Sequence, residues 1–251
     1  MFGIFPIGTA GCGKSLLTGS LKSWLQQRGK SVAALNLDPG VLYLPYMADV
    51  DIRQHVDIKQ IMDKYELGPN GALIAASDLA IERLDKVNSE IQDLASEYVI
   101  IDTPGQMELF AFRASGLAWF QGLDLDQKII LFLFDGPFCI QPVNYVSILY
   151  LAAAVYNRMV APQLNVLTKM DLLTKKKLTE ILKWSSEPES LRMSLRDERS
   201  SHTYLLSRDM FTSIARLQLD FSLIACSAKH LHNFVGLEAA IQRMFGYEDN
   251  V

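Results

Sequence analysis

The sequence predicts an α/β fold in which helices flank a doubly wound, mostly parallel sheet. Two observations predict this class. Short apolar runs rich in β-branched residues alternate with segments of helical length along the chain, and such runs are typical of strands that are buried on both faces. A glycine-rich loop follows the first apolar run and precedes the first helical segment, which is the order found in α/β domains that bind phosphate groups.

Strands are expected where an apolar run is bounded by polar or turn-forming residues, and helices where a longer segment has apolar residues at helical spacing. The expected strands are Phe2–Phe5, Ser31–Leu37, Tyr98–Ile101, Lys128–Phe134, Gln163–Leu167 and Phe221–Ala225. The expected helices are Leu16–Arg28, Asp78–Glu97, Val143–Asn157, Lys175–Trp184, Tyr204–Leu217 and Val235–Phe245. Two stretches interrupt this alternation: Pro39–Gly71, with a short helical candidate at Ile58–Tyr65, and the polar stretch Ser185–Arg208.

Length and composition limit the possibilities. Of the 251 residues, 49% are hydrophobic and 21% are charged, so we expect one domain over residues 1–251, with insertions at about 39–71 and 185–208. The net charge of -4 argues against unselective binding to nucleic acids. The three cysteines have neither metal nor disulfide spacing, and no apolar run reaches the roughly 18 residues of a membrane helix. We therefore expect a cytoplasmic protein without a membrane partner.

A phosphate-binding loop is the strongest motif. The residues from Gly8 to Ser15 match G-x-x-x-x-G-K-[ST], a pattern whose backbone N–H groups surround phosphate oxygens at the start of a helix. Lys14 would reach the β- and γ-phosphates, and the Ser15 hydroxyl would ligate Mg²⁺. The expected nucleotide contacts in this region are Gly8, Thr9, Ala10, Gly11, Cys12, Gly13, Lys14, Ser15 and Leu16. The loop identifies a P-loop nucleotide-binding fold.

A second motif follows the strand candidate at Tyr98–Ile101. The segment Asp102-Thr103-Pro104-Gly105-Gln106, here called the DTPGQ turn, begins with a carboxylate that would hold a Mg²⁺-bound water opposite Ser15. The Gly105 N–H would sense the γ-phosphate, and Gln106 would bind the attacking water. The same residues also suit an ordinary turn at the end of a strand, but together with the phosphate loop they predict a hydrolytic switch.

Two later motifs predict the base. An Asp171 carboxylate in Thr168-Lys169-Met170-Asp171 would accept both the N1–H and the N2–H₂ groups of guanine, whereas N1 of adenine is itself an acceptor. Lys169 would cover one face of the base. The backbone N–H groups of Ser227-Ala228-Lys229 would donate to guanine O6. Because both motifs follow strands, they are expected at the ligand edge of the sheet, and guanine is favoured over adenine.

With these motifs in place, the chain resembles the GPN-loop GTPases, homodimeric relatives of the signal-recognition-particle and MinD class of P-loop proteins. The tripeptide that names them stands here as Gly68-Pro69-Asn70, here called the GPN segment, and the resemblance extends from Met1 to about Gly246. It implies a homodimer in which Asn70 faces the γ-phosphate or the attacking water of the partner. A simple turn before the helix near Asp78 is the alternative. Thr168, where many GTPases have Asn, is expected to weaken a hydrogen bond that braces the loop.

The resemblance also implies roles for residues between the second strand and the GPN segment. Asp38 is a candidate for orienting the attacking water or the Mg²⁺ shell, although an Asp before Pro39 also suits a turn. The segment Asp51-Ile52-Arg53 resembles the first switch of the family. Arg53 would answer the γ-phosphate there, or it would serve as an ordinary surface ion-pair partner.

The function predicted from all these observations is hydrolysis of GTP to GDP and phosphate by a Mg²⁺-dependent homodimer that acts as a conformational switch. Lys14 would oppose the developing charge, while Gln106, Asp38 and Asn70 order the water. The alternative is a nucleotide-gated assembly factor for a protein client, because the apolar segment Phe110–Phe120 would present a binding surface unless it packs in the core or at a dimer contact. Eukaryotic members of the family assist RNA polymerase assembly, which makes that machinery a possible client by resemblance.

Overall fold

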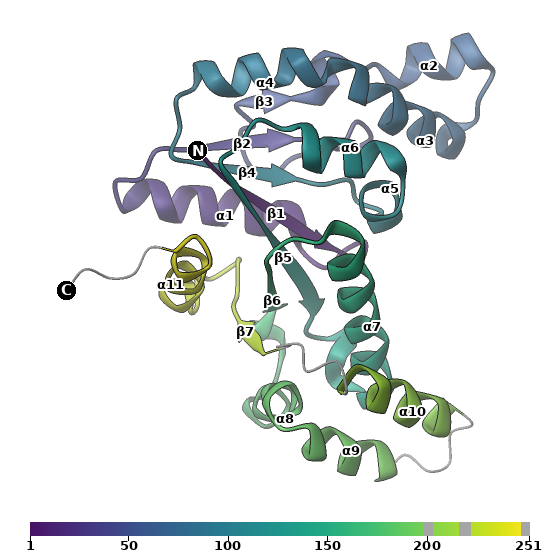
Figure 1. The fold of residues 1–251 in the computed structure, drawn as a ribbon, viewed down its shortest axis with the longest axis vertical. Coiled ribbons are helices and arrows are strands. Elements are labelled where there is room, and N and C mark those ends of the chain that lie inside the picture. Colours follow the sequence, from purple (N-terminus) through teal and green to yellow (C-terminus); the bar gives the residue numbers. More distant parts are fainter. Residues whose placement is uncertain (198–202, 216–221, 247–251) are drawn as a thin grey trace.

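The computed structural model describes residues 1–197, 203–215 and 222–246 (Figure 1). One seven-stranded sheet runs through it in the order β3-β2-β4-β1-β5-β6-β7, and every neighbouring pair of strands is parallel. The strands are β1 (Phe2–Gly8), β2 (Val32–Asn36), β3 (Val50–Asp51), β4 (Tyr98–Asp102), β5 (Gln127–Asp135), β6 (Gln163–Thr168) and β7 (Leu223–Ala225). The predicted α/β class is confirmed, and the sheet is wholly parallel.

Helices cover both faces of this sheet. Figure 1 shows α1 and α11 on one side and α4, α5, α6 and α7 on the other. The helices are α1 (Lys14–Gln27), α2 (Ile58–Tyr65), α3 (Pro69–Leu79), α4 (Leu84–Asp93), α5 (Met107–Ala111), α6 (Ala114–Gly122), α7 (Pro142–Met159), α8 (Lys175–Ser186), α9 (Pro188–Asp197), α10 (Thr203–Ala215) and α11 (Phe234–Met244). Within the described ranges, none of these helices combines the length and the apolar character that a bilayer crossing requires.

Two hydrophobic clusters fix the helices to the sheet. On one face, Leu17 and Leu21 of α1 pack with Phe234 of α11 against strand residues such as Ile4. On the other face, a larger cluster joins the helices from α2 to α10 to the alternate strand residues, including Phe5. Because successive side chains of a strand point to opposite faces, the uninterrupted apolar runs of the sequence serve both clusters.

The region around the GPN segment differs from the prediction. The helix expected over Asp78–Glu97 is wrong in its start: α3 already begins at Pro69, a 3₁₀ turn follows at Ala80–Arg83, and α4 ends at Asp93. Pro69 suits the first turn of a helix because its ring fixes φ and its missing N–H group would have no helical partner there. The GPN segment is therefore the N-terminus of a helix and not a loop that precedes one.

The insertions contain more regular structure than the sequence suggests. The short helix expected at Ile58–Tyr65 is confirmed as α2, and Asp57 caps it by accepting from the Lys59 N–H at 2.8 Å. The brief strand β3 was not predicted. The polar stretch Ser185–Arg208 contains α9, which buries Leu191 and Leu195 one helical turn apart. Leu217, at the end of one predicted helix, and Phe221, at the start of the last predicted strand, lie outside the described residues.

Candidate nucleotide-binding site

The phosphate loop connects β1 to α1 at the carboxyl edge of the sheet. Gly11 and Gly13 have φ values of 76° and 103°, a left-handed conformation that glycine adopts without steric cost. This allows the chain to curl into the first turn of α1, which starts at Lys14 with Gly13 as its N-cap. Thr9, Ala10 and Gly11 remain accessible, Cys12 is buried, and Leu16 is exposed on the first turn of α1.

The Lys14 side chain joins the phosphate loop to the DTPGQ turn. Its Nζ atom donates to the carbonyl oxygens of Gly8 at 2.9 Å and Thr9 at 3.2 Å. It also donates to the carbonyl oxygen of Gly105 at 2.9 Å. Lys14 is 5% exposed, and these hydrogen bonds place its ammonium group between the two predicted phosphate-binding segments.

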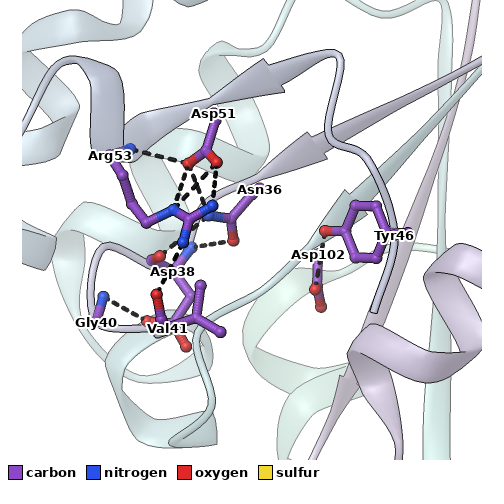
Figure 2. Close-up of polar contacts among 8 residues, drawn as sticks. All are labelled: Asn36, Asp38, Gly40, Val41, Tyr46, Asp51, Arg53 and Asp102. Carbon is purple, nitrogen blue, oxygen red and sulfur yellow. Dashed lines mark hydrogen bonds and ion pairs between the residues drawn. The ribbon is translucent and has the colours of Figure 1, made fainter. Parts of the chain in front are cut away.

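Asp102, at the end of β4, is the buried acid of the site. The residue is 1% exposed, and its Oδ2 atom accepts from the Tyr46 hydroxyl at 3.0 Å (Figure 2). Burial raises the pKa of the Asp102 carboxyl to about 6, although the nearby Ser15 and Tyr46 hydroxyls and the Lys14 charge oppose this rise. Its Oδ1 atom is buried without a hydrogen-bond partner in the described structure.

These groups fit a magnesium ion. Ser15 stands in the first turn of α1, beside the Asp102 carboxylate, and Mg²⁺ takes hydroxyl and carboxylate oxygens together with water and phosphate oxygens. The unpartnered Oδ1 atom of Asp102 supplies an acceptor for a water of such an ion, as a buried polar atom needs a partner. Two of the three residues predicted for the metal, Ser15 and Asp102, are thus placed together, whereas the third, Asp38, is bound to the Gly40 and Gly105 N–H groups.

The Asp38 carboxylate connects the segment after β2 to the DTPGQ turn. Oδ1 accepts from the Gly40 N–H at 2.8 Å, which is the predicted turn (Figure 2), and Oδ2 accepts from the Gly105 N–H at 2.8 Å. Gly105 is therefore held on both sides, by Asp38 at its N–H and by Lys14 at its carbonyl. A γ-phosphate oxygen can accept from this N–H only by taking the place of Asp38.

A polar network supports the segment that carries Asp38. The Asn36 amide donates to Oδ1 of Asp51 at 2.9 Å and accepts from the Asp38 N–H at 3.0 Å. Arg53 pairs with both Asp51 oxygens and donates to the Val41 carbonyl at 3.0 Å (Figure 2). Burial tends to raise the Asp51 pKa, but the hydrogen bonds from Arg53 and Asn36 outweigh it and lower the pKa. Of the two interpretations of Arg53, the structure shows the ion pair.

Thr168, at the end of β6, braces the phosphate loop from behind. Its buried hydroxyl lies 2.8 Å from the Cys12 carbonyl and 3.1 Å from the Phe134 carbonyl. The bracing hydrogen bond that we expected to be weakened by Thr in place of Asn is therefore made by the hydroxyl. A hydroxyl has a single proton to donate, so the two carbonyl oxygens share it.

The predicted base-recognition residues lie together beyond this brace. The Asp171 carboxylate has its pKa lowered, chiefly by the Ser227 hydroxyl and also by the charges of His230 and Lys229. Lys169 is fixed by an ion pair with Asp135 at 2.9 Å. The Ser227 N–H already donates to the His232 carbonyl at 3.2 Å, so of the three backbone amides expected at guanine O6, those of Ala228 and Lys229 are the candidates.

Gln106 and Asn70 differ in their position relative to the phosphate loop and the DTPGQ turn. Gln106 is exposed as the N-cap residue of α5, directly after Gly105. Asn70 is exposed in the first turn of α3, where it lines a cavity of about 670 Å³ with residues such as Gly40 and Arg53. The phosphate loop contributes no residue to the lining of that cavity. Asn70 thus lines a cavity in which Lys14 has no part.

The apolar segment after the DTPGQ turn is mainly part of the core. Phe110, Trp119 and Phe120 are 2%, 3% and 6% exposed, and Gly116 lies against the backbone of Phe110. Among its aromatic residues Phe112 is the exception, with 42% exposure. Core packing, one of the two interpretations of Phe110–Phe120, is what the structure shows, and the assembly-factor alternative gains no binding surface from most of this segment.

Sequence reasoning missed two groups near the phosphate-binding edge. One is Tyr46, which reaches Asp102 from the loop between β2 and β3. The other is the pair of Lys22 on α1 and Asp49 before β3, joined at 2.6 Å. Neither stands in a motif, and a tyrosine or a distant ion pair in an irregular stretch carries no spacing signal. Only the folded chain brings Tyr46 to Asp102 and joins Lys22 to Asp49.

Comparisons with known proteins agree with this geometry. A family model described as a conserved hypothetical ATP binding protein matches residues 7–247. The chain is 31% identical over 234 residues to a GPN-loop GTPase of Pyrococcus abyssi, covering 92% of this chain and 92% of that protein. It is 29% identical over 259 residues to GPN-loop GTPase 3 of Schizosaccharomyces pombe, covering 98% of this chain and 89% of that protein. Among solved structures, the apo form of a Pyrococcus abyssi GTPase matches with a TM-score of 0.85 and 30% identity, over 99% of this chain and 98% of that one.

Proposed function

This chain belongs to the GPN-loop GTPase family, and from that premise we propose that it hydrolyses GTP in a Mg²⁺-dependent homodimer and so acts as a nucleotide-dependent conformational switch. Membership of the family makes it a GTP hydrolase. We further propose that residues 1–251 form one GTPase domain that works in the cytoplasm. The three cysteines, which are free and buried, suit a reducing compartment.

The observation that carries the proposal is the meeting of the phosphate loop, Asp38 and the DTPGQ turn at Gly105. Lys14 and Asp38 hold the two sides of this residue at 2.9 Å and 2.8 Å. Any group that takes over either contact shifts the segments attached to Gly105. A γ-phosphate has oxygen atoms for the Gly105 N–H and for the Lys14 ammonium, so its arrival and its loss on hydrolysis would move both segments.

The chemistry falls mainly to positioning and to charge. Lys14 and the phosphate-loop amides would bind the phosphates and oppose the charge that develops in the transition state. Ser15 directly, and Asp102 through a water, would hold a magnesium ion, which supplies positive charge at the β- and γ-phosphate oxygens. Gln106 is exposed next to Gly105 and would orient the attacking water, with Asp38 as the neighbouring carboxylate.

Guanine is the proposed base because the Asp171 carboxylate, which lies beside Ser227 and Lys229, would accept both N1–H and N2–H₂. The family description names ATP, whereas the relatives are named GTPases. Adenine would face the Asp171 carboxylate with the acceptor N1, which leaves both groups unpaired. Lys169, held by an ion pair with Asp135, would cover one face of the base.

A second copy of the chain gives Asn70 a role. The side chain is exposed on the first turn of α3 and lines a cavity that includes no phosphate-loop residue. In Figure 1 the turn between α2 and α3 lies at the outer end of the molecule, away from the turn between β1 and α1. We propose that this end reaches the nucleotide of the partner, where the Asn70 amide would both donate and accept hydrogen bonds.

Turnover of GTP and ATP by the wild type, Asn70→Ala and Asn157→Ala tests the proposal, with the oligomeric state measured by light scattering. Asn157 is an exposed residue of α7 and serves as the matched control. We expect a GTP-selective dimer in which only Asn70→Ala lowers turnover, by about tenfold or more for one lost transition-state hydrogen bond. Equal use of ATP contradicts the guanine assignment. A monomer that keeps full activity after Asn70→Ala contradicts the role of the partner.

A further inference from the structure

Tyr46 reaches the buried acid of the site from a loop far away in the sequence. Its hydroxyl donates to Oδ2 of Asp102 at 3.0 Å, a contact between residues 56 positions apart. Figure 2 shows the ring standing alone beside Asp102, apart from the cluster of Asn36, Asp51 and Arg53. The contact therefore needs an explanation separate from the network that supports Asp38.

The loop that carries Tyr46 is fixed on both sides. Lys22 of α1 donates to the Met47 carbonyl at 3.0 Å and to the Asp49 carboxylate at 2.6 Å. Asp49 in turn accepts from the Ala34 N–H of β2 at 2.7 Å. Tyr46 is thus held between helix α1, which begins at the phosphate-binding edge, and strand β2, which ends there.

Helix α1 also makes room for the ring. A Cβ atom built on Gly19 would lie 2.8 Å from the Tyr46 Cβ atom, a distance at which one of the two groups must shift. The ring packs against this helix one turn after Ser15. Packing explains why an aromatic ring occupies the position, but it does not explain the hydroxyl group, because a phenylalanine would pack equally well.

The hydroxyl fixes how the Asp102 carboxylate is turned. With Oδ2 bound to Tyr46, the other oxygen, Oδ1, is buried and has no hydrogen-bond partner in the described structure. Hydrogen bonds from a hydroxyl to a carboxylate are among the stronger ones in proteins, and a buried carboxylate that loses one is free to rotate. The orientation therefore leaves Oδ1 as the acceptor for a further group.

We propose that Tyr46 is a positioning residue, which holds the Asp102 carboxylate in the orientation that the magnesium site requires. This inference rests on the proposed function, since it presupposes that Ser15 and Asp102 hold magnesium. It adds a contact from the loop between β2 and β3 to a site otherwise built from the phosphate loop and the DTPGQ turn.

Binding of a fluorescent, non-hydrolysable GTP analogue tests the proposal. Its affinity is measured during a titration with MgCl₂ and again in excess EDTA for the wild type, Tyr46→Phe and Tyr43→Phe. Tyr43 is 80% exposed in the same loop, which makes it a matched control. Circular dichroism sets a temperature at which all three proteins are folded. The Phe substitution removes one oxygen atom and keeps the ring on α1.

We expect Tyr46→Phe to raise the half-saturating Mg²⁺ concentration about tenfold or more, as for the loss of one hydrogen bond to a charged group. Affinity in EDTA should stay unchanged, and Tyr43→Phe should behave as the wild type. An unaltered Mg²⁺ midpoint for Tyr46→Phe, or an equal loss of affinity in EDTA, overturns the role of Tyr46 alone. A wild-type affinity that is independent of Mg²⁺ overturns the magnesium site as well, which separates the two failures.

Discussion

The Asp38 carboxylate accepts the Gly105 N–H at 2.8 Å and so ties the segment after β2 to the turn after β4. Asp38 was a candidate through the family resemblance, and Gly105 was a candidate through the DTPGQ turn. Their contact makes Asp38 part of the same unit as Lys14, which holds the Gly105 carbonyl at 2.9 Å.

Replacement of Asp38 by Ala should lower GTP turnover strongly. The change removes the acceptor of two backbone N–H groups, those of Gly40 and Gly105, together with the carboxylate proposed to face the attacking water. We expect kcat to fall by about a hundredfold or more, as for lost positioning and charge in other hydrolytic sites. Steady-state turnover measures this effect.

Asp63→Ala is the control for Asp38→Ala, because Asp63 is exposed on α2. It should change kcat by less than about twofold, within the range of ordinary surface substitutions. If Asp38→Ala raised KM and left kcat unaltered, Asp38 would serve nucleotide binding and not the chemical step.

The Asp171 side chain should set the base preference. In Asp171→Asn the amide offers a donor where the carboxylate offered an acceptor. Two hydrogen-bond donors, the amide NH₂ and the N2–H₂ of guanine, would then face each other. We expect GTP affinity to fall at least about a hundredfold, while xanthosine triphosphate, which has a carbonyl oxygen at C2, should bind better than GTP. Competition binding with the two nucleotides measures the reversal. A variant that still prefers GTP would place the base elsewhere.

The motifs at strand ends were predictable because their chemistry is local. The phosphate loop, the DTPGQ turn and the Thr168–Asp171 segment each combine a short residue pattern with a preceding strand, and parallel strands bring their carboxyl ends to one edge. The contacts that these motifs make with one another at this edge were not predictable. That the Thr168 hydroxyl meets the Cys12 carbonyl at 2.8 Å depends on the register of β6 against β5, which no residue pattern states.

In the insertion after β2, a helix was predictable only where its own segment contains an N-cap residue and apolar residues at helical spacing. Asp57 at the N-cap and the apolar spacing within Ile58–Tyr65 are enough for α2. The start of α3 at Pro69 was missed, because a Gly-Pro pair also begins turns and only packing decides between them. In the structure, Ala72 and Ala76 of α3 are fully buried, and this burial stabilises the helix.

The ion pair between Asp51 and Arg53 should make a pH-dependent contribution to stability. The Asp51 pKa is lowered in the folded protein from an ordinary value of 3.8. Such a group stabilises the fold fully above 3.8 and loses this contribution as the pH falls through the lower, folded-state pKa. We expect Asp51→Asn to reduce the free energy of unfolding at pH 7 by about 2 kcal/mol, and by much less at pH 3.

Urea unfolding of the wild type and Asp51→Asn at the two pH values measures this difference. Asp63→Asn on the exposed face of α2 controls for the change in net charge. Its effect on the free energy of unfolding should be small and should not be larger at pH 7 than at pH 3. An Asp51→Asn penalty that is equal at pH 3 and pH 7 would mean that packing and not the charge of Asp51 stabilises this network.

Gly19→Ala should destabilise the protein, although alanine in the middle of a helix is normally better than glycine by about 1 kcal/mol. The new Cβ atom would lie 2.8 Å from the Tyr46 Cβ atom, which belongs to a loop held by Lys22 and Asp49 and therefore unable to yield freely. Overpacking of this kind costs about 1–3 kcal/mol, so the net change in the free energy of unfolding should be a loss.

The same change should also disturb the contact between Tyr46 and Asp102, because the ring can escape the new methyl group only by moving away from α1. Thermal unfolding and the Mg²⁺ midpoint of nucleotide binding should therefore shift together in Gly19→Ala. For thermal unfolding, Gly71→Ala in α3 is the control for helix propensity, since a Cβ atom there would meet Leu67 at an ordinary contact distance of 3.5 Å and should not destabilise the protein. A Gly19→Ala protein that is more stable than the wild type would show that the loop between β2 and β3 yields easily, and a rigid hold of Tyr46 on Asp102 would then be untenable.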